Sequence, residues 1–163
     1  MSTELNIKNL EIAKNSDFWI RLYIRCAAIL LIVTGLLKIF SAIGNATVLQ
    51  TLDPVLHFSF RGVLISAGAV EIAIGTICLL RGQTPLCSGL IAWVATMFCA
   101  YRFCLMLSGY QKPCPCLGNL TDALKIPPHA ADTAMKLLLA FLLVGGYGLV
   151  VHHTWRRTKG VAP

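Results

Sequence analysis

Long apolar runs alternate with short polar connections along this chain. The apolar runs cover about residues 19–43, 60–80, 86–107 and 131–151. Each run has about the 20 residues that a helix needs to cross a bilayer. Gly82 and Pro85 mark a tight turn between the second and third runs. The pattern predicts an all-α fold, a polytopic membrane protein built as a four-transmembrane-helix bundle.

The pattern also divides the chain into three parts. Residues 1–18 form an N-terminal segment, residues 19–155 a membrane domain, and residues 156–163 a short tail. The N-terminal segment is polar with scattered leucine and isoleucine, which fits a short helix on the membrane surface and a poorly ordered terminus equally well. The first apolar run is too long for the core of a signal peptide. We therefore expect it to remain as a membrane anchor.

Lysine and arginine predict the orientation of the bundle. One side carries Lys8, Lys14, Arg21, Arg25, Arg81, Arg156, Arg157 and Lys159. The other side carries only Arg61, Lys112, Lys125 and Lys136. Because cytoplasmic loops are enriched in basic residues, both termini are expected in the cytoplasm and the 108–130 loop outside it. In a bacterial inner (cytoplasmic) membrane that loop faces the periplasm, where disulfides persist.

Composition agrees with a lipid environment. Hydrophobic residues make up 56% of the 163 residues and charged residues 13%, whereas soluble domains carry about a quarter charged residues. The formal net charge is +7, and in a membrane protein such an excess reports orientation. The sequence has no basic stripe interleaved with aromatic residues, so the expected partner is the lipid bilayer and not a nucleic acid.

A polar loop between the third and fourth runs contains two closely spaced cysteines. Of the seven cysteines, only Cys114 and Cys116 lie in this loop, on either side of Pro115. A disulfide across one residue is strained, and strained disulfides are easily reduced. Lys112 and a helix predicted to begin near Asn119 would favour the thiolate. These features predict an extracytoplasmic Cys-Pro-Cys redox loop in which Cys114 and Cys116 are the catalytic pair.

Other interpretations of the cysteines stay open. Two thiolates also suit a soft metal such as copper or zinc, but His129 is the only nearby imidazole, so we assign no metal ligands. A Pro-Cys-Pro-Cys run also makes a rigid turn. Cys99 and Cys104, in the third run, are candidates for a second redox station, although two buried, inert thiols are the more expected outcome.

Three charged residues lie within the apolar runs. At about 1.5 Å per residue, Lys38 and Arg102 lie about 8 and 9 Å below the outer end of their helices, and Glu71 about 16 Å deep. Intramembrane charges are costly and usually functional, so we predict an intramembrane polar cluster of Lys38, Glu71 and Arg102 beneath the redox loop. Alternatively, the two cations reach the surface and Glu71 pairs with one of them. Trp93 and Tyr101 either border a quinone-sized pocket or only pack.

Three motifs occur together in one order. They are Gly35-Leu36-Leu37-Lys38, Glu71-Ile72-Ala73-Ile74-Gly75 and Cys114-Pro115-Cys116-Leu117-Gly118. In this order they resemble the MauE/DoxX family of redox-associated membrane proteins. The resemblance implies a four-helix membrane bundle, and MauE-like members are associated with methylamine utilisation through the maturation of a disulfide-rich periplasmic dehydrogenase. DoxX-like members include a subunit of a thiosulfate:quinone oxidoreductase. The chain differs from the similar vitamin K epoxide reductase relatives, because it lacks a Cys-x-x-Cys at a helix start.

The leading hypothesis is a membrane-embedded thiol–disulfide redox protein. It would support the oxidation or maturation of a periplasmic redox or dehydrogenase partner, or exchange electrons with it, through Cys114 and Cys116. Quinone is the candidate cofactor. The alternatives are a non-enzymatic membrane subunit or assembly factor of a periplasmic or quinone-linked oxidoreductase, and a soft-metal carrier. The sequence leaves open whether the chain is a thiol–disulfide oxidoreductase in its own right, which cysteine attacks, the direction of electron flow, the partner and the oligomeric state.

Overall fold

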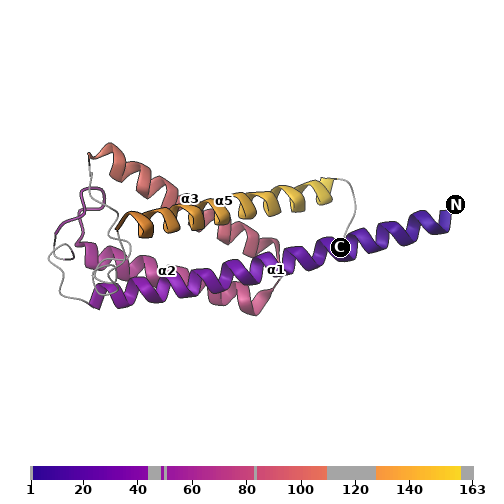
Figure 1. The fold of residues 1–163 in the computed structure, drawn as a ribbon, viewed down its shortest axis with the longest axis horizontal. Coiled ribbons are helices and arrows are strands. Elements are labelled where there is room, and N and C mark those ends of the chain that lie inside the picture. Colours follow the sequence, from indigo (N-terminus) through magenta and orange to yellow (C-terminus); the bar gives the residue numbers. More distant parts are fainter. Residues whose placement is uncertain (1, 44–48, 50, 83, 110–127, 159–163) are drawn as a thin grey trace.

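The residues that the structure describes form four long helices (Figure 1). The computed structural model describes residues 2–43, 49, 51–82, 84–109 and 128–158. The helices are α1 (Ser2–Ile43), α2 (Phe60–Arg81), α3 (Pro85–Leu107) and α5 (Pro128–Thr158). Each contains a stretch long and apolar enough to cross a membrane, as Asp17–Ile43, Phe60–Arg81, Pro85–Leu107 and Asp132–Trp155. This confirms the predicted all-α fold with four candidate membrane spans.

Helix α1 extends well beyond its membrane span. It runs without a break from Ser2 to Ile43, and its N-terminal part projects past the other helices (Figure 1). Residues 2–18 are therefore neither a separate surface helix nor a loose terminus, but the first turns of the same helix. No proline interrupts this stretch, so nothing in the backbone forces a helix break before the span.

Glycines bring α1 and α2 into close contact. A Cβ atom at Gly35 would lie 2.7 Å from the carbonyl oxygen of Gly68, and a Cβ at Gly68 would lie 2.7 Å from the carbonyl oxygen of Gly35. About two helical turns further along α2, a Cβ at Gly75 would lie 2.7 Å from the Ala28 carbonyl oxygen. Small residues let membrane helices approach backbone to backbone, where dispersion replaces the missing hydrophobic effect. The two helices pack along their length (Figure 1).

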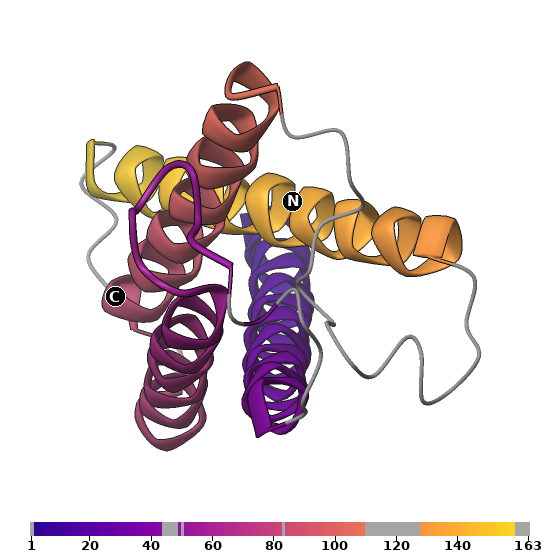
Figure 2. The ribbon, with the colours of Figure 1, turned by 90° about the vertical axis from the view of Figure 1, so that its left-hand side faces the viewer.

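The remaining helices form a second pair, α3 with α5, which is inclined across α1 and α2 (Figure 2). Gly146 of α5 faces the backbone of Ala92 of α3, and Gly145 faces the Tyr23 ring of α1. The Tyr23 hydroxyl donates to the Leu142 carbonyl oxygen at 3.2 Å. Where the helices meet, they bury a common core. It includes Ile24, Leu31, Ile74, Ile91, Val94 and Leu142.

The turn between α2 and α3 is tight. Gly82 ends α2 with φ +62° and donates its amide to the Cys78 carbonyl oxygen at 3.1 Å, a backbone conformation that suits glycine. Pro85 then begins α3. This is the turn that Gly82 and Pro85 predict from the sequence.

Large apolar side chains cover the outside of the bundle. They include Trp19, Phe40, Ile65, Leu80, Trp93, Leu137, Val144 and Trp155. A water-soluble monomer rarely exposes an apolar surface of this extent. The exposed apolar surface therefore fits contact with lipid, as expected of a multi-pass membrane protein.

Candidate functional site

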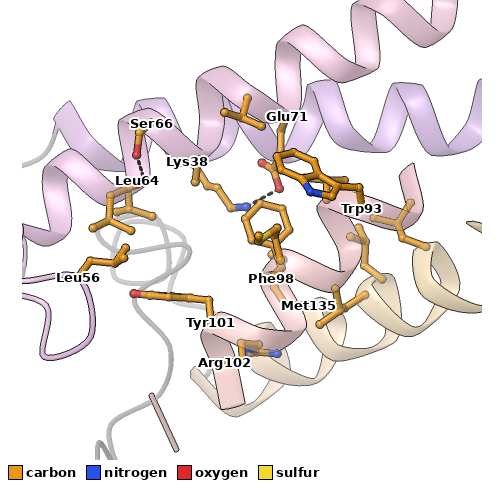
Figure 3. A pocket seen from close by; sticks show the side chains of 18 of the residues that line it. Lys38, Leu56, Leu64, Ser66, Glu71, Trp93, Phe98, Tyr101, Arg102 and Met135 are labelled. Atoms are coloured by element: carbon orange, nitrogen blue, oxygen red, sulfur yellow. Dashed lines mark hydrogen bonds and ion pairs between the residues drawn. The ribbon is translucent and has the colours of Figure 1, made fainter. Parts of the chain in front are cut away.

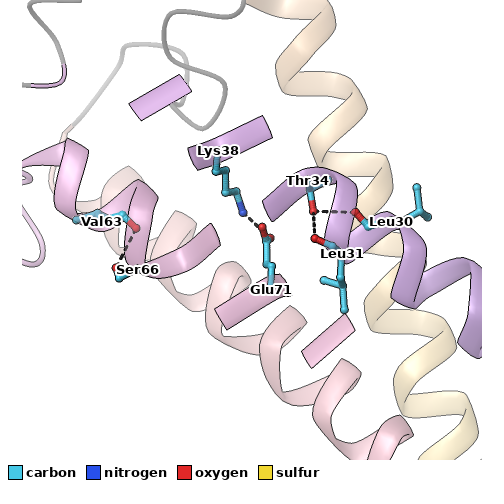
Figure 4. A network of polar contacts seen from close by, with 7 residues as sticks. All are labelled: Leu30, Leu31, Thr34, Lys38, Val63, Ser66 and Glu71. Atoms are coloured by element: carbon cyan, nitrogen blue, oxygen red, sulfur yellow. Dashed lines mark hydrogen bonds and ion pairs between the residues drawn. The ribbon is translucent and has the colours of Figure 1, made fainter. Parts of the chain in front are cut away.

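A buried ion pair joins α1 to α2. Lys38 Nζ lies 2.5 Å from Glu71 Oε1, and the two side chains are only 6% and 3% exposed (Figure 4). The glycine contacts described above bring the two backbones close enough for this bond, since Gly35 lies three residues before Lys38 and faces the Glu71 Cβ position at 3.2 Å. Taking two charges out of water is costly, so a retained buried pair needs good geometry and further partners.

Helix α3 supplies a further partner for Lys38. The Lys38 ammonium lies 4.1 Å from the centre of the Phe98 ring, a distance at which the ring quadrupole attracts a cation. Figure 3 shows the Lys38 side chain directed toward Glu71 with Phe98 beside it. The cation thus contacts residues from two other helices, α2 and α3.

Within the described residues, Glu71 Oε2 is buried and accepts no hydrogen bond of standard geometry. The neighbouring Thr34 hydroxyl is directed at the carbonyl oxygens of Leu30 and Leu31, at 2.9 and 3.1 Å (Figure 4). A buried acceptor that lacks a donor is costly and calls for an explanation such as a ligand or a water.

Arg102 forms a different ion pair. Its guanidinium binds Asp132 of α5, and Asp132 also binds Lys136 at 2.6 Å, one helical turn away. The sequence suggested one cluster of Lys38, Glu71 and Arg102, whereas the structure divides these charges between a fully buried pair and a pair whose side chains are 20% and 18% exposed. Asp132 escaped the sequence analysis because it lies at the beginning of the fourth apolar run, where a carboxylate needs no special explanation.

The Lys38–Glu71 pair and Arg102 border one cavity. It has a volume of about 350 Å³ and lies between all four helices. Most of its wall is apolar, and the polar groups come from Lys38, Ser66, Glu71, Tyr101 and Arg102 (Figure 3). Its apolar wall includes Phe60, Leu64, Trp93, Met97, Phe98, Met135, Leu138 and Leu142. A mostly apolar cavity with a few convergent polar groups is the usual form of a small-molecule site.

The α1–α2 connection covers one side of this cavity. Asp53 is fully buried, accepts the amides of Val55 and Leu56 at 2.7 and 3.0 Å, and binds the Tyr101 hydroxyl of α3. Leu56 lines the cavity. The contact between Asp53 and Tyr101 therefore attaches the connection to α3 beside the cavity. Asp53 was missed from the sequence because a lone aspartate in a connecting segment is normally solvated.

Two of the cysteines of α3 face outward, whereas Cys87 is buried. Cys99 and Cys104 both have exposed side chains, so the expectation that these two thiols are buried is wrong. Ala95, Cys99 and Met106 lie on one face of α3. Ala95 is buried, whereas Cys99 and Met106 are exposed. Cys114 and Cys116 lie outside the described residues. Within the described part of the chain, no group of three or more His, Cys, Asp or Glu side chains is arranged to hold a metal ion.

No family model, curated protein or solved structure matches this chain. The site must therefore be interpreted from its own residues.

Proposed function

We propose that this protein is a membrane-embedded thiol–disulfide redox protein, in which Cys114 and Cys116 oxidise an extracytoplasmic partner and the cavity binds a quinone from the lipid phase. In this proposal the 108–130 loop lies on the periplasmic side of a bacterial inner membrane and both termini lie in the cytoplasm, because basic residues gather at the termini. The resemblance of the three sequence motifs to MauE/DoxX proteins agrees with such a role.

The observation that carries the proposal is the Lys38–Glu71 pair in the wall of an apolar cavity. A quinone has a flat apolar ring and two carbonyl oxygens. The Lys38 ammonium has donors left over for a carbonyl oxygen, and Glu71 Oε2 has no donor among the described residues. The hydroxyl of the reduced form, a quinol, would supply that donor. Trp93 and Phe98 lie in the cavity wall where an aromatic ring would stack (Figure 3).

Chain connectivity relates the redox loop to the cavity. The loop leaves α3 after Leu107 and joins α5 at Pro128. Arg102, which lines the cavity, lies five residues before Leu107, or about 8 Å along α3. Met135, which also lines it, lies seven residues after Pro128, or about 10 Å along α5. Lys38 lies five residues before the end of α1. The loop is therefore attached at the end of the bundle that contains the cavity.

The proposed reaction balances as a two-electron exchange. A partner thiolate attacks the Cys114–Cys116 disulfide, and one loop cysteine leaves as a thiolate. The second partner thiol then resolves the mixed disulfide, so that the partner is oxidised and both loop cysteines are reduced. A bound quinone supplies the acceptor for the two electrons and two protons released when the loop disulfide forms again. Lys38 and Glu71 would bind and orient it.

Trapping of mixed disulfides tests the exchange step. Cys114→Ser and Cys116→Ser are expressed separately, and free thiols are blocked in intact cells before non-reducing electrophoresis. We expect one of the two variants to accumulate a covalent complex with a partner. Cys99→Ser, which changes an exposed cysteine of α3, is the matched control and should behave like the unmodified protein. The exchange model fails if neither loop variant traps a partner and cells with either variant still oxidise the partner.

The tight packing of α1 against α2 favours a second function, a non-enzymatic membrane subunit that docks a periplasmic oxidoreductase. In that case the buried pair and the glycine contacts only stabilise the docking scaffold. Cys114→Ser/Cys116→Ser would then retain function, whereas Gly68→Leu, which separates the two helices, would abolish it.

A further inference from the structure

Two arginines of α1 border a second pocket, at the opposite end of the bundle from the cavity. The pocket has a volume of about 260 Å³ and is lined by Arg21, Ile24, Arg25 and Gly82. It therefore lies between α1 and the turn that joins α2 to α3. Gly82 leaves this side open, because a Cβ atom there would meet nothing within 4 Å.

The depth of these arginines corresponds to a membrane interface. Arg25 lies 18 residues before Ile43, about 27 Å along the helix, and Arg21 about 33 Å. The hydrocarbon core of a bilayer is about 30 Å thick. If Ile43 marks one boundary, the two guanidinium groups lie at the other, at the level of the phosphates. Trp19, which is 60% exposed, lies beside them, where an interfacial tryptophan is expected.

The pocket is cationic. Arg21 and Arg25 are one helical turn apart, are exposed, and form no ion pair within the described residues. Arg81, also exposed, directly precedes Gly82. Guanidinium groups bind phosphate oxygens bidentately, and basic pockets between membrane helices are a known form of phospholipid headgroup site.

We propose that Arg21 and Arg25, with the turn at Gly82, bind the phosphate of an anionic phospholipid such as phosphatidylglycerol. Ile24, between the two arginines, is buried and closes the inner side of the pocket. The exposed apolar side chains of α1, such as Leu22 and Ile29, then face the lipid tails. This site is separate from the cavity, so it holds or fails independently of the quinone proposal. Its ligand chemistry is a phosphate diester, which a free phosphate shares in part.

Native mass spectrometry of the full chain tests this site. The protein is released from nanodiscs that contain equal amounts of phosphatidylglycerol and phosphatidylcholine, and retained lipid is counted. We expect the unmodified protein to retain phosphatidylglycerol preferentially, and Arg21→Gln/Arg25→Gln to reduce that preference about 30-fold, as two cationic groups at a membrane surface predict. The control Arg156→Gln/Arg157→Gln removes the same charge near the end of α5 and should leave the preference unchanged.

Two further measurements separate the remaining explanations. Arg21→Lys/Arg25→Lys keeps the charge and should fold even if the glutamine variant does not; we expect it to lose several-fold in preference, because lysine lacks the bidentate fork. Soluble glycerol 3-phosphate in excess should not displace the lipid. The proposal is overturned if Arg21→Gln/Arg25→Gln and Arg156→Gln/Arg157→Gln show the same preference for phosphatidylglycerol. It is also overturned if the lysine variant retains phosphatidylglycerol as well as the unmodified protein does, or if glycerol 3-phosphate displaces the lipid.

Discussion

Replacing Lys38 and replacing Glu71, the two residues of the buried ion pair, should lower the stability of the protein by unequal amounts. In Lys38→Met, Glu71 is left as a buried acid about 16 Å from either end of α2, too deep for its short side chain to reach water. Loss of one partner of a buried pair costs about 3–5 kcal/mol. In Glu71→Leu, Lys38 remains only about 8 Å from the end of α1, so its long side chain can reach the interface. We expect that variant to lose only about 1 kcal/mol.

The double variant Lys38→Met/Glu71→Leu removes both charges and leaves side chains of similar volume. Replacement of a buried pair by apolar residues is often neutral, so we expect the free energy of unfolding to return to within about 1 kcal/mol of the unmodified protein. The single losses sum to about 4–6 kcal/mol, so a loss of at most about 1 kcal/mol in the double variant corresponds to a coupling energy of about 3–6 kcal/mol between the two sites.

Unfolding of the purified protein in mixed detergent micelles, followed by the loss of helical circular dichroism as the denaturing detergent is increased, measures all four free energies. Comparison of these four proteins also separates stability from binding, since the double variant should be stable but unable to bind a quinone. Equal losses in the two single variants would contradict the depth argument. A double variant as unstable as the sum of the single variants would contradict the pairing.

Three other predictions concern the helix contacts around the cavity. Gly68→Leu should prevent close packing of α1 and α2 and cost more than about 3 kcal/mol of stability by overpacking, read out by the same detergent titration, with Gly89→Leu, at an open position on α3, as its control. Tyr101→Phe removes the hydroxyl that binds Asp53 and should make the α1–α2 connection more accessible to protease, with a loss of about 1–3 kcal/mol because a buried carboxylate loses a donor. Asp132→Asn should lower stability by no more than about 1 kcal/mol, because its pair with Arg102 is partly exposed.

Much of the architecture could be predicted because lipid imposes simple rules. A run of about 20 apolar residues must become a helix, and glycine followed by proline marks where one ends and the next begins. The predicted end of the second run differs from the end of α2 by one residue, because Arg81 is charged but still closes the last helical turn. The start of α1 was not predicted, since a polar segment of helix formers gives no periodic signal for where it begins.

The pairing of charges was harder to predict. Depth alone places Lys38, Glu71 and Arg102 near one another, but the choice of partner depends on which helices pack. Gly35 and Gly68 bring α1 against α2, so Lys38 reaches Glu71. Arg102 instead faces α5, where Asp132 lies.

Details of side-chain direction were also beyond the sequence. Tyr23 looks like an interfacial aromatic residue near a span end, yet it fits against Gly145 of α5, where any larger residue would overlap its ring. Cys99 faces outward although it follows buried Ala95 by one turn. Such outcomes depend on the tilt between α3 and α5, which no single-helix pattern encodes.

The most direct test of the central claim is quinol formation by the reduced protein. The protein in nanodiscs is reduced, freed of reductant and mixed without oxygen with a short-chain quinone, and the quinone absorbance is followed. We expect about one quinol per protein from the Cys114–Cys116 pair, none from Cys114→Ser/Cys116→Ser, and strongly slowed formation in Lys38→Met/Glu71→Leu. No quinol from the unmodified protein, or equal amounts from the protein without loop cysteines, would contradict this claim.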